Sequence, residues 1–226
     1  YQHKYYADFS VAMPYSTKLP TGNRVAFSPT VTLGWNLANE KFLENSIFDN
    51  LMLTASVGII NQDLDITASD NEDGYYLYKT VVQKGGWYSW GDNGGLAATE
   101  FQRGNNPDMT YVKRKEFTAG LRGSMWSNLI NFDINFFTSK MDGGLVRPGS
   151  LYPNYFTQIG YPSSSIIPYV NFNVDQRTGF DFSVYANKKV GEVDLTLGVS
   201  GMYYKSTAKK RDENIEFSYL SAVGRA

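Results

Sequence analysis

The sequence contains no cysteine, a single histidine and no long apolar run. Without cysteine, the chain cannot form disulfide bonds, zinc–thiolate sites or a cysteine nucleophile. His3 alone cannot supply a Ser-His-Asp triad or a histidine-rich metal site. Because apolar runs extend over only a few residues, no helix of this chain is expected to span a bilayer.

The sequence also lacks a basic excess. Its 21 Lys and Arg residues are balanced by 22 Asp and Glu residues, which gives a formal net charge of -1. Such a chain has no surplus of cations to neutralise phosphates, so a nucleic-acid partner is not expected. Aromatic residues make up 15% and are led by tyrosine. Membrane-interface belts and carbohydrate-binding surfaces share this bias.

The stretch from residue 106 to residue 137 predicts a β-hairpin. Apolar residues occupy odd positions from Phe117 to Met125 and even positions from Ile130 to Phe136. A two-residue turn at Ser127 and Asn128 places Met125 opposite Ile130. Both apolar sets then share one face of the sheet.

The other face of this hairpin is mostly Thr, Gly, Ser and Asn, with few charges. A water-facing sheet of a soluble protein is usually richer in Lys and Glu. The composition suits the wet lumen of a transmembrane barrel whose apolar face contacts lipid. The alternative is a soluble β-barrel or lectin-like carbohydrate-binding protein, in which the same apolar face would point inward.

The same alternation predicts an all-β chain of about eight antiparallel strands. The further strands are expected around residues 5–13, 25–35, 51–59, 180–186, 193–199 and 215–220. Apolar residues change from even to odd positions between 180–186 and 193–199, which predicts a second hairpin with an even-length turn around residues 188–191. Pro29 predicts a bulge or a weak ladder. Residues 36–50 lose the two-residue period and predict a short helix with Asn39 as a possible cap.

Long and short connections alternate along the chain. The long ones, residues 61–110 and 141–171, fall at one end of the strands and predict extracellular loops, with short periplasmic turns at the other end. Trp35 and Trp126 are then expected at the periplasmic end, and Tyr203 and Tyr204 at the outer end, as two aromatic girdles.

Four segments carry a family resemblance, which extends from Asn23 to Lys205. They are NRVAFSPTVTLGWNLANEKFL, FDNLMLTASVGIINQ, NPDMTYVKRKEFTAGLRGSMWSNLINFDINFFTSKMDGGL and VNFNVDQRTGFDFSVYANKKVGEVDLTLGVSGMYYK. In this order they resemble the middle of the barrel of SusC/RagA-type TonB-dependent outer-membrane transporters.

The resemblance implies a barrel of about 22 strands in a Gram-negative outer membrane. It also implies a plug domain, energy from the TonB complex and a SusD-like surface lipoprotein that captures glycans or peptides. Residues 1–226 would form a partial TonB-dependent receptor β-barrel domain, with the plug, the TonB box and the closing strands absent. No catalytic activity, cofactor or metal is implied.

The candidate ligand-contact residues are aromatic side chains of the two long loops. Exposed aromatic rings suit both sugar rings and peptide side chains. Packing of the loops onto each other or onto the lipoprotein is the alternative role. The candidates are Trp87, Tyr88, Trp90, Tyr75, Tyr76, Tyr152 and Tyr155, and Tyr78 lies beside them.

Charged residues and glycines suggest further sites. Lys113, Arg114 and Lys115 are expected at the outer end of their strand, where they face lipopolysaccharide phosphates or only solvent. Residues 70–73 are acidic but lack the spacing of an EF-hand; a solvated loop tip and an irregular calcium site both stay open. Asp181 and Asp194 form a weak carboxylate pair for glycan hydrolysis. The glycine pairs at 85–86, 94–95 and 143–144 indicate loop flexibility.

Overall fold

The computed structural model describes residues 3–44, 46–67, 75–91, 93–151 and 166–225. It contains nine strands and short 3-10 helices and is all-β, as predicted. The strands are β1 (Tyr5–Ala12), β2 (Ser28–Asn36), β3 (Phe48–Gln62), β4 (Val81–Trp90), β5 (Asn93–Arg103), β6 (Val112–Met125), β7 (Ile130–Val146), β8 (Val170–Val190) and β9 (Val193–Lys210). The 3-10 helices are η1 (Thr21–Asn23), η2 (Leu37–Asn39), η3 (Lys41–Leu43), η4 (Gly149–Leu151) and η5 (Ser218–Leu220).

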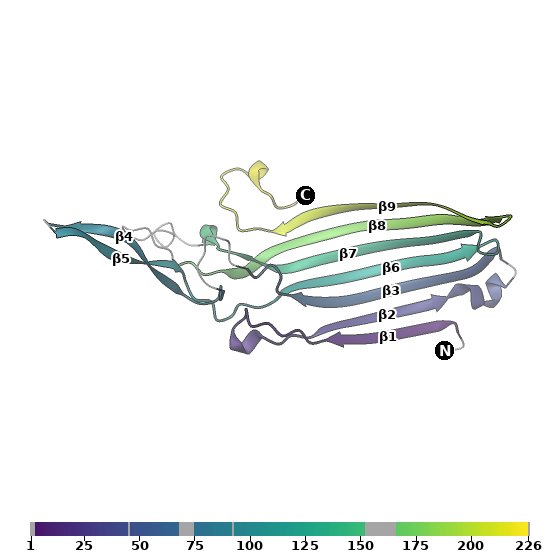
Figure 1. The fold of residues 1–226 in the computed structure, drawn as a ribbon, viewed down its shortest axis with the longest axis horizontal. Helices are drawn as coiled ribbons and strands as arrows, with labels where there is room; N and C mark the ends of the chain where they lie inside the picture. The colour runs from purple at the N-terminus through teal and green to yellow at the C-terminus, as the bar shows by residue number, and fades with distance from the viewer. Residues whose placement is uncertain (1–2, 45, 68–74, 92, 152–165, 226) are drawn as a thin grey trace.

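Seven strands form one antiparallel sheet in the order β1-β2-β3-β6-β7-β8-β9. The connections β2–β3, β6–β7 and β8–β9 lie at one end of the sheet, and the longer connections lie at the opposite end (Figure 1). We call these the short-turn end and the long-loop end. The predicted alternation of connections is therefore confirmed. Trp35 and Trp126 both lie at the short-turn end, as predicted.

The two predicted hairpins have the expected register. Met125 lies opposite Ile130, and the left-handed φ angles of Ser127 (55°) and Asn128 (62°) are those that a tight hairpin turn requires. In the second hairpin, Val190 lies opposite Val193 across a two-residue turn. The change of parity in the sequence thus identified the turns correctly.

The strand predicted at residues 215–220 is wrong. This segment lies in a loop at the long-loop end and contains η5, where the rings of Phe217 and Tyr219 stack at 5.5 Å. The alternation there reflects this local stacking of residues two apart. The chain returns to β9 later, because Ala208 and the segment at Gly224 and Arg225 exchange two backbone hydrogen bonds of 2.8 and 2.9 Å.

The helix predicted in residues 36–50 is also wrong. The segment forms the single 3-10 turns η2 and η3, and the Asn39 amide donates to the His3 carbonyl (2.8 Å) without capping a helix. At Pro29 the register with β1 shows no bulge, but the ladder between β2 and β3 starts one residue later, at Thr30. The weak ladder is confirmed and the bulge is not.

The glycine pairs were misinterpreted as loop features. Residues 85–86 lie in β4 and residues 94–95 in β5, so the long connection contains a separate two-stranded hairpin that projects beyond the sheet (Figure 1). Gly143 and Gly144 lie in β7 at a register shift. Gly143 has a φ of 85°, which identifies this irregularity as a β-bulge that needs glycine.

Neither face of the seven-stranded sheet carries a packed hydrophobic core in the described part of the chain. Large apolar residues stay exposed, including Phe9 at 68% and Leu197 at 80%. The one cluster of buried residues lies in the loops: Leu19, Ile66, Leu77, Met109 and Tyr111. A soluble barrel or sandwich would bury its apolar face, so this arrangement argues against the soluble alternative.

The exposed apolar face leads to a test in the full-length protein. Leu121 lies on that face in the middle of β6, and Thr118 lies on the opposite face of the same strand. If the apolar face contacts lipid, Leu121→Arg should destabilise the folded barrel by about 2 to 4 kcal/mol and Thr118→Arg by much less. Denaturant unfolding in lipid vesicles measures both, and equal losses would contradict the assignment of faces.

Candidate functional site

The apolar face forms a band whose long-loop edge is well defined on β3, β6, β7, β8 and β9. On each of these strands, every second residue lies on the apolar face. Toward the long-loop end, the residue two positions beyond the last apolar residue on this face is Asn, Thr or Lys. These edge residues are Ile59 on β3, Phe117 on β6, Phe136 on β7, Phe180 on β8 and Tyr203 on β9. On β3 and β6 the band covers nine positions, Leu51 to Ile59 and Phe117 to Met125, which is the length of a tilted membrane strand.

This band crosses the sheet obliquely. The register aligns Tyr203, Phe180 and Phe136 with Ala119 of β6, whereas Ile59 aligns with Lys115. The edge therefore moves by four residues over the four strand steps from β9 to β3. With about 3.3 Å per residue and about 4.8 Å per step, the strands tilt by roughly 35° from the normal to the band.

The short-turn edge of the band moves in the same direction. At this edge, Ile130 of β7 is in register with Met125 of β6, whereas Trp35 of β2 is in register with Leu121 of β6. The edge thus shifts by four residues toward the long-loop end from β7 to β2. A tilt of about 35 to 45° is typical of strands in transmembrane barrels. Tyr203 lies at the long-loop edge of the band, although it is in the middle of β9. Tyr204 is on the opposite face by alternation, so that part of the girdle prediction is wrong.

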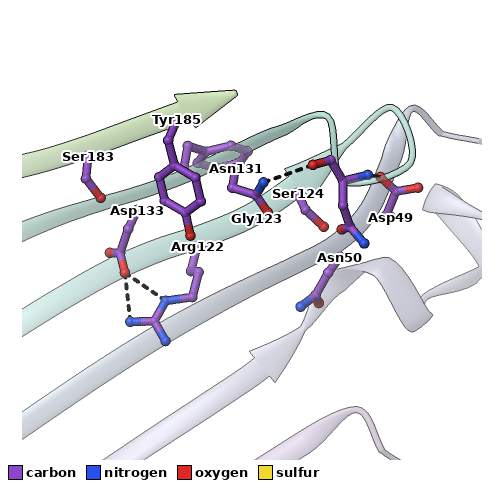
Figure 2. A pocket seen from close by; sticks show the side chains of 11 residues that line it. Asp49, Asn50, Arg122, Gly123, Ser124, Asn131, Asp133, Ser183 and Tyr185 are labelled. Atoms are coloured by element: carbon purple, nitrogen blue, oxygen red, sulfur yellow. Dashed lines mark hydrogen bonds and ion pairs between the residues drawn. The ribbon is translucent and has the colours of Figure 1, made fainter. Parts of the chain in front are cut away.

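The opposite face is polar and carries a chain of hydrogen bonds near the short-turn end, of which Figure 2 shows the contact between Arg122 and Asp133. Arg122 donates to Asp133 at 2.7 Å, and the Asn135 amide bridges Asp133 (2.8 Å) and Asp181 (2.9 Å). Arg122 and Asp133 line an open pocket together with Asp49, whose carboxylate accepts the Asn128 backbone N–H at 2.8 Å. Arg122 and Asp133 form an ion pair on this face, and Asp181 and Asp49 accept hydrogen bonds from neutral donors.

The carboxylate pair Asp181 and Asp194 is not brought together. Asp181 pairs with Met202, eight residues along β9 from Asp194, which corresponds to about 26 Å. Glycoside hydrolysis needs two carboxyl groups within about 5 to 9.5 Å. This carboxylate pair therefore cannot perform glycan hydrolysis.

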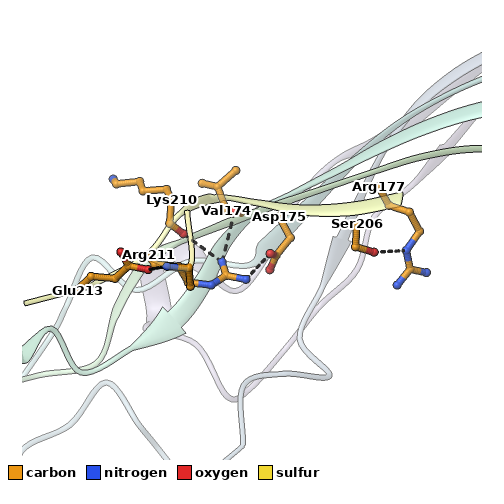
Figure 3. A network of polar contacts seen from close by, with 8 residues as sticks. Val174, Asp175, Arg177, Ser206, Lys210, Arg211 and Glu213 are labelled. Carbon is orange, nitrogen blue, oxygen red and sulfur yellow. Dashed lines mark hydrogen bonds and ion pairs between the residues drawn. The ribbon is translucent and has the colours of Figure 1, made fainter. Parts of the chain in front are cut away.

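A second cavity on the polar face lies at the long-loop end and is lined by four arginines: Arg114, Arg177, Arg211 and Arg225. Arg211 is ion-paired with Asp175 and also donates to the Val174 carbonyl (Figure 3). Arg177 donates through Nε to Ser206 at 3.4 Å. Its guanidinium stacks over Tyr204 at 4.7 Å.

Arg114 lines this cavity, whereas its sequence neighbours Lys113 and Lys115 do not. Arg114 points to the polar face, where it donates to Ser139 (3.1 Å) and pairs with Glu116 (3.2 Å). By alternation, the two lysines lie on the apolar side. The prediction that all three face lipopolysaccharide is wrong for Arg114, because adjacent strand residues point to opposite faces.

The long loops form a small ordered unit above the sheet. Tyr111 is buried beside Leu19, Ile66 and Met109, and its hydroxyl contacts the carbonyls of Arg24 (2.7 Å) and Pro14 (3.2 Å). Burial raises the pKa of Tyr111 above its ordinary value, so the hydroxyl stays a donor. The unit holds several loops in one arrangement at the long-loop end.

Three of the predicted aromatic contacts can be placed with their side chains. Tyr75 and Tyr76 are exposed at 53% and 37%. Their rings meet edge to face at 5.0 Å, and Tyr76 meets Tyr78 at 5.7 Å. Lys79 lies over the Tyr76 ring at 4.7 Å. These tyrosines form a continuous aromatic cluster at the base of the β4–β5 hairpin.

The other predicted aromatics lie either on the backbone of β4 or outside the described residues. Trp87, Tyr88 and Trp90 lie on the β4 backbone, opposite Ala97, Leu96 and Asn93, and their side chains fall outside what the structure describes. Tyr152, Tyr155 and the acidic residues 70–73 also lie outside the described residues. Within the described ranges, no group of three or more His, Cys, Asp or Glu side chains is placed to hold a metal ion.

At the short-turn end, Glu40 holds the ends of β1 and β2. It accepts hydrogen bonds from the Trp35 indole (3.1 Å) and the Lys4 ammonium (3.0 Å). These two donors hold the pKa of Glu40 below its ordinary value.

None of the described helices is long and apolar enough to cross a bilayer.

The chain is similar to solved structures of the RagAB peptide importer. With its closed-closed state it shares a TM-score of 0.68 and 19% identity, over 94% of this chain and 21% of the other. With its open-open state the values are 0.68 and 20%, over 95% and 21%. The chain thus spans about a fifth of the length of these structures. No family model and no curated protein matches the sequence. The likeness establishes the fold, a segment of an antiparallel barrel wall.

The loop unit leads to a second test. Tyr111→Phe removes both hydroxyl contacts and should loosen the loops by about 1 kcal/mol. Hydrogen exchange of residues 14–26 should then become about fivefold faster in the full-length protein. Tyr219→Phe, which removes an exposed hydroxyl at the same end, is the control. Unchanged exchange in Tyr111→Phe would show that other contacts hold these loops.

Proposed function

We propose that this chain is part of the barrel wall of a TonB-dependent, SusC-like importer in a Gram-negative outer membrane. The observation that carries the proposal is the oblique apolar band on one face of the sheet, opposite a polar face. An exposed band of this height and tilt has a stabilising environment only in lipid. The similarity in fold to the RagAB importer also supports the proposal that the chain is a segment of a barrel wall.

In this proposal the long-loop end is extracellular and the short-turn end is periplasmic, as in bacterial outer-membrane barrels. The aromatic cluster at Tyr75, Tyr76 and Tyr78 and the β4–β5 hairpin then face the medium. A SusD-like lipoprotein would dock on these loops. The TonB complex would act through a plug domain supplied by the rest of the protein. The chain acts in transport and catalyses no reaction.

For the substrate we favour peptides over neutral glycans. The cavity lined by Arg114 and Arg177 lies on the polar face, beyond the outer edge of the apolar band, where an incoming molecule enters the barrel. Every peptide carries a terminal carboxylate, which guanidinium groups bind through charge-assisted hydrogen bonds. The structures that share this fold are those of the RagAB peptide importer. Aromatic loops suit either substrate.

The arginine cavity gives the test of the substrate class. Arg177→Gln removes a cation that, in the described part of the chain, contacts Ser206 and Tyr204. In cells that express the full-length importer, half-maximal uptake of a peptide mixture should need about tenfold more peptide, because one charged hydrogen bond contributes about 1.5 kcal/mol or more. The amount of folded barrel should not change.

The matched control is Arg122→Gln, at the other end of the same face. It should leave uptake of the peptide mixture nearly unchanged. If Arg177→Gln weakens the uptake of C-terminally amidated neutral peptides equally, the arginine does not read a carboxylate. If peptides are not taken up at all and oligosaccharides are, the peptide assignment is wrong.

The hairpin aromatics give the test of the contact surface. Trp87→Ala combined with Trp90→Ala should reduce substrate uptake or lipoprotein affinity several-fold, because aromatic anchors dominate such contacts. Uptake assays and pull-down of the lipoprotein measure the two effects separately. Tyr203→Leu, on the lipid-facing side, is the control and should change neither. Wild-type behaviour of the double variant in both assays would exclude the hairpin as a contact surface.

A further inference from the structure

Lysines gather on the apolar side of β6–β9, immediately beyond the long-loop edge of the band. Toward the long-loop end, Lys115 lies two positions beyond Phe117 on β6, and Lys205 lies two positions beyond Tyr203 on β9. Lys140 lies four positions beyond the band edge on β7, and Lys113 four positions beyond it on β6. All four side chains are exposed.

The register places two of these lysines directly opposite each other. Lys115 pairs with Lys140 across β6 and β7. Directly opposed like charges repel and destabilise a sheet pair. One acidic residue, Asp142, shares this face and lies 3.7 Å from Lys115. Four cations against one carboxylate leave an excess of positive charge that an external anion would stabilise.

The position of the lysines on the sheet determines which kind of anion can bind to them. The lysines lie on the lipid-facing side, not in the lumen, and they begin where the apolar band ends. At the extracellular end of an outer-membrane barrel, this level is occupied by the headgroups of the outer leaflet. We propose that Lys113, Lys115, Lys140 and Lys205 bind the phosphate groups of lipid A, the lipid anchor of lipopolysaccharide. This inference rests on the membrane orientation in the proposed function.

Several features of the sequence and the register agree with this site. Lys140 and Lys205 are far from Lys115 in the sequence, and only the pairing of β6 with β7, β8 and β9 brings them onto one face. β7 and β9 flank a single strand, and Lys140 and Lys205 are offset by two residues along it, so their backbones lie about 12 Å apart. A headgroup with more than one anionic group can contact lysines on both strands. The lysine stem would pack on the band while the ammonium reaches the phosphate.

The test uses the full-length protein in detergent and native mass spectrometry. Purified phosphorylated lipid A and enzymatically dephosphorylated lipid A are the two probes. The wild type should bind the phosphorylated probe far more tightly. The triple variant Lys115→Gln, Lys140→Gln and Lys205→Gln should lose that preference by roughly a hundredfold, since each surface lysine contributes about fivefold.

Lys188→Gln is the matched control, because Lys188 lies on the same face by parity but at the short-turn end. It should keep the wild-type preference. The proposal is overturned if the triple variant keeps the preference, if Lys188→Gln loses it equally, or if phosphatidylglycerol binds as tightly as lipid A. Substrate uptake is measured in parallel: lost lipid A binding with normal uptake supports this site, and absent uptake in the wild type contradicts only the importer proposal.

Discussion

The antiparallel ladder, with its strict period of two residues, is the constraint on which the rest of this structure depends. Backbone N–H and C=O groups in a bilayer must be paired within the protein, and a sheet does this between strands. The pairing fixes which residues share a face. In this chain one face becomes a continuous apolar band and the other a polar wall with paired charges such as Arg122 and Asp133.

The register also gives a property that no single strand contains, the angle of the band. The band edge moves by four residues over the four strand steps from β9 to β3, so the strands cross it at roughly 35° on average. A sheet on a soluble core has no reason to keep its apolar residues within such an oblique stripe. The same angle assigns a depth to each residue, which separates Lys115 and Lys205 from the band and places the arginine cavity at its mouth.

Much of the sheet could be predicted from the sequence because the period and the change of parity are local signals. They located both tight turns, the ends at which Trp35 and Trp126 lie, and the face of Leu121. They failed where a local pattern had another cause: Phe217 and Tyr219 alternate because their rings stack. Gly143 resembles a loop residue in the sequence, but it forms a bulge.

The candidate site was harder to predict because it is assembled from distant segments. The aromatic loop residues are predicted from composition alone, and their role in binding stays a prediction. The arginine cavity combines β6, β8 and the segment after β9, and nothing in the local sequence of Arg177 or Arg211 signals that they meet. Arg114 was grouped with its lysine neighbours in the sequence, whereas the ladder turns it to the opposite face.

The most direct test of the membrane-spanning band is the depth of spin labels in the full-length protein reconstituted in vesicles. Single cysteines replace Tyr203, Ile59 and Ala55. Tyr203 and Ala55 share a register position, whereas Tyr203 and Ile59 share the band edge. The oblique band predicts equal, shallow depths at positions 203 and 59 and a position 55 that is about 11 Å deeper. Equal depths at 203 and 55, or free access of a water-soluble relaxer to all three labels, would contradict it.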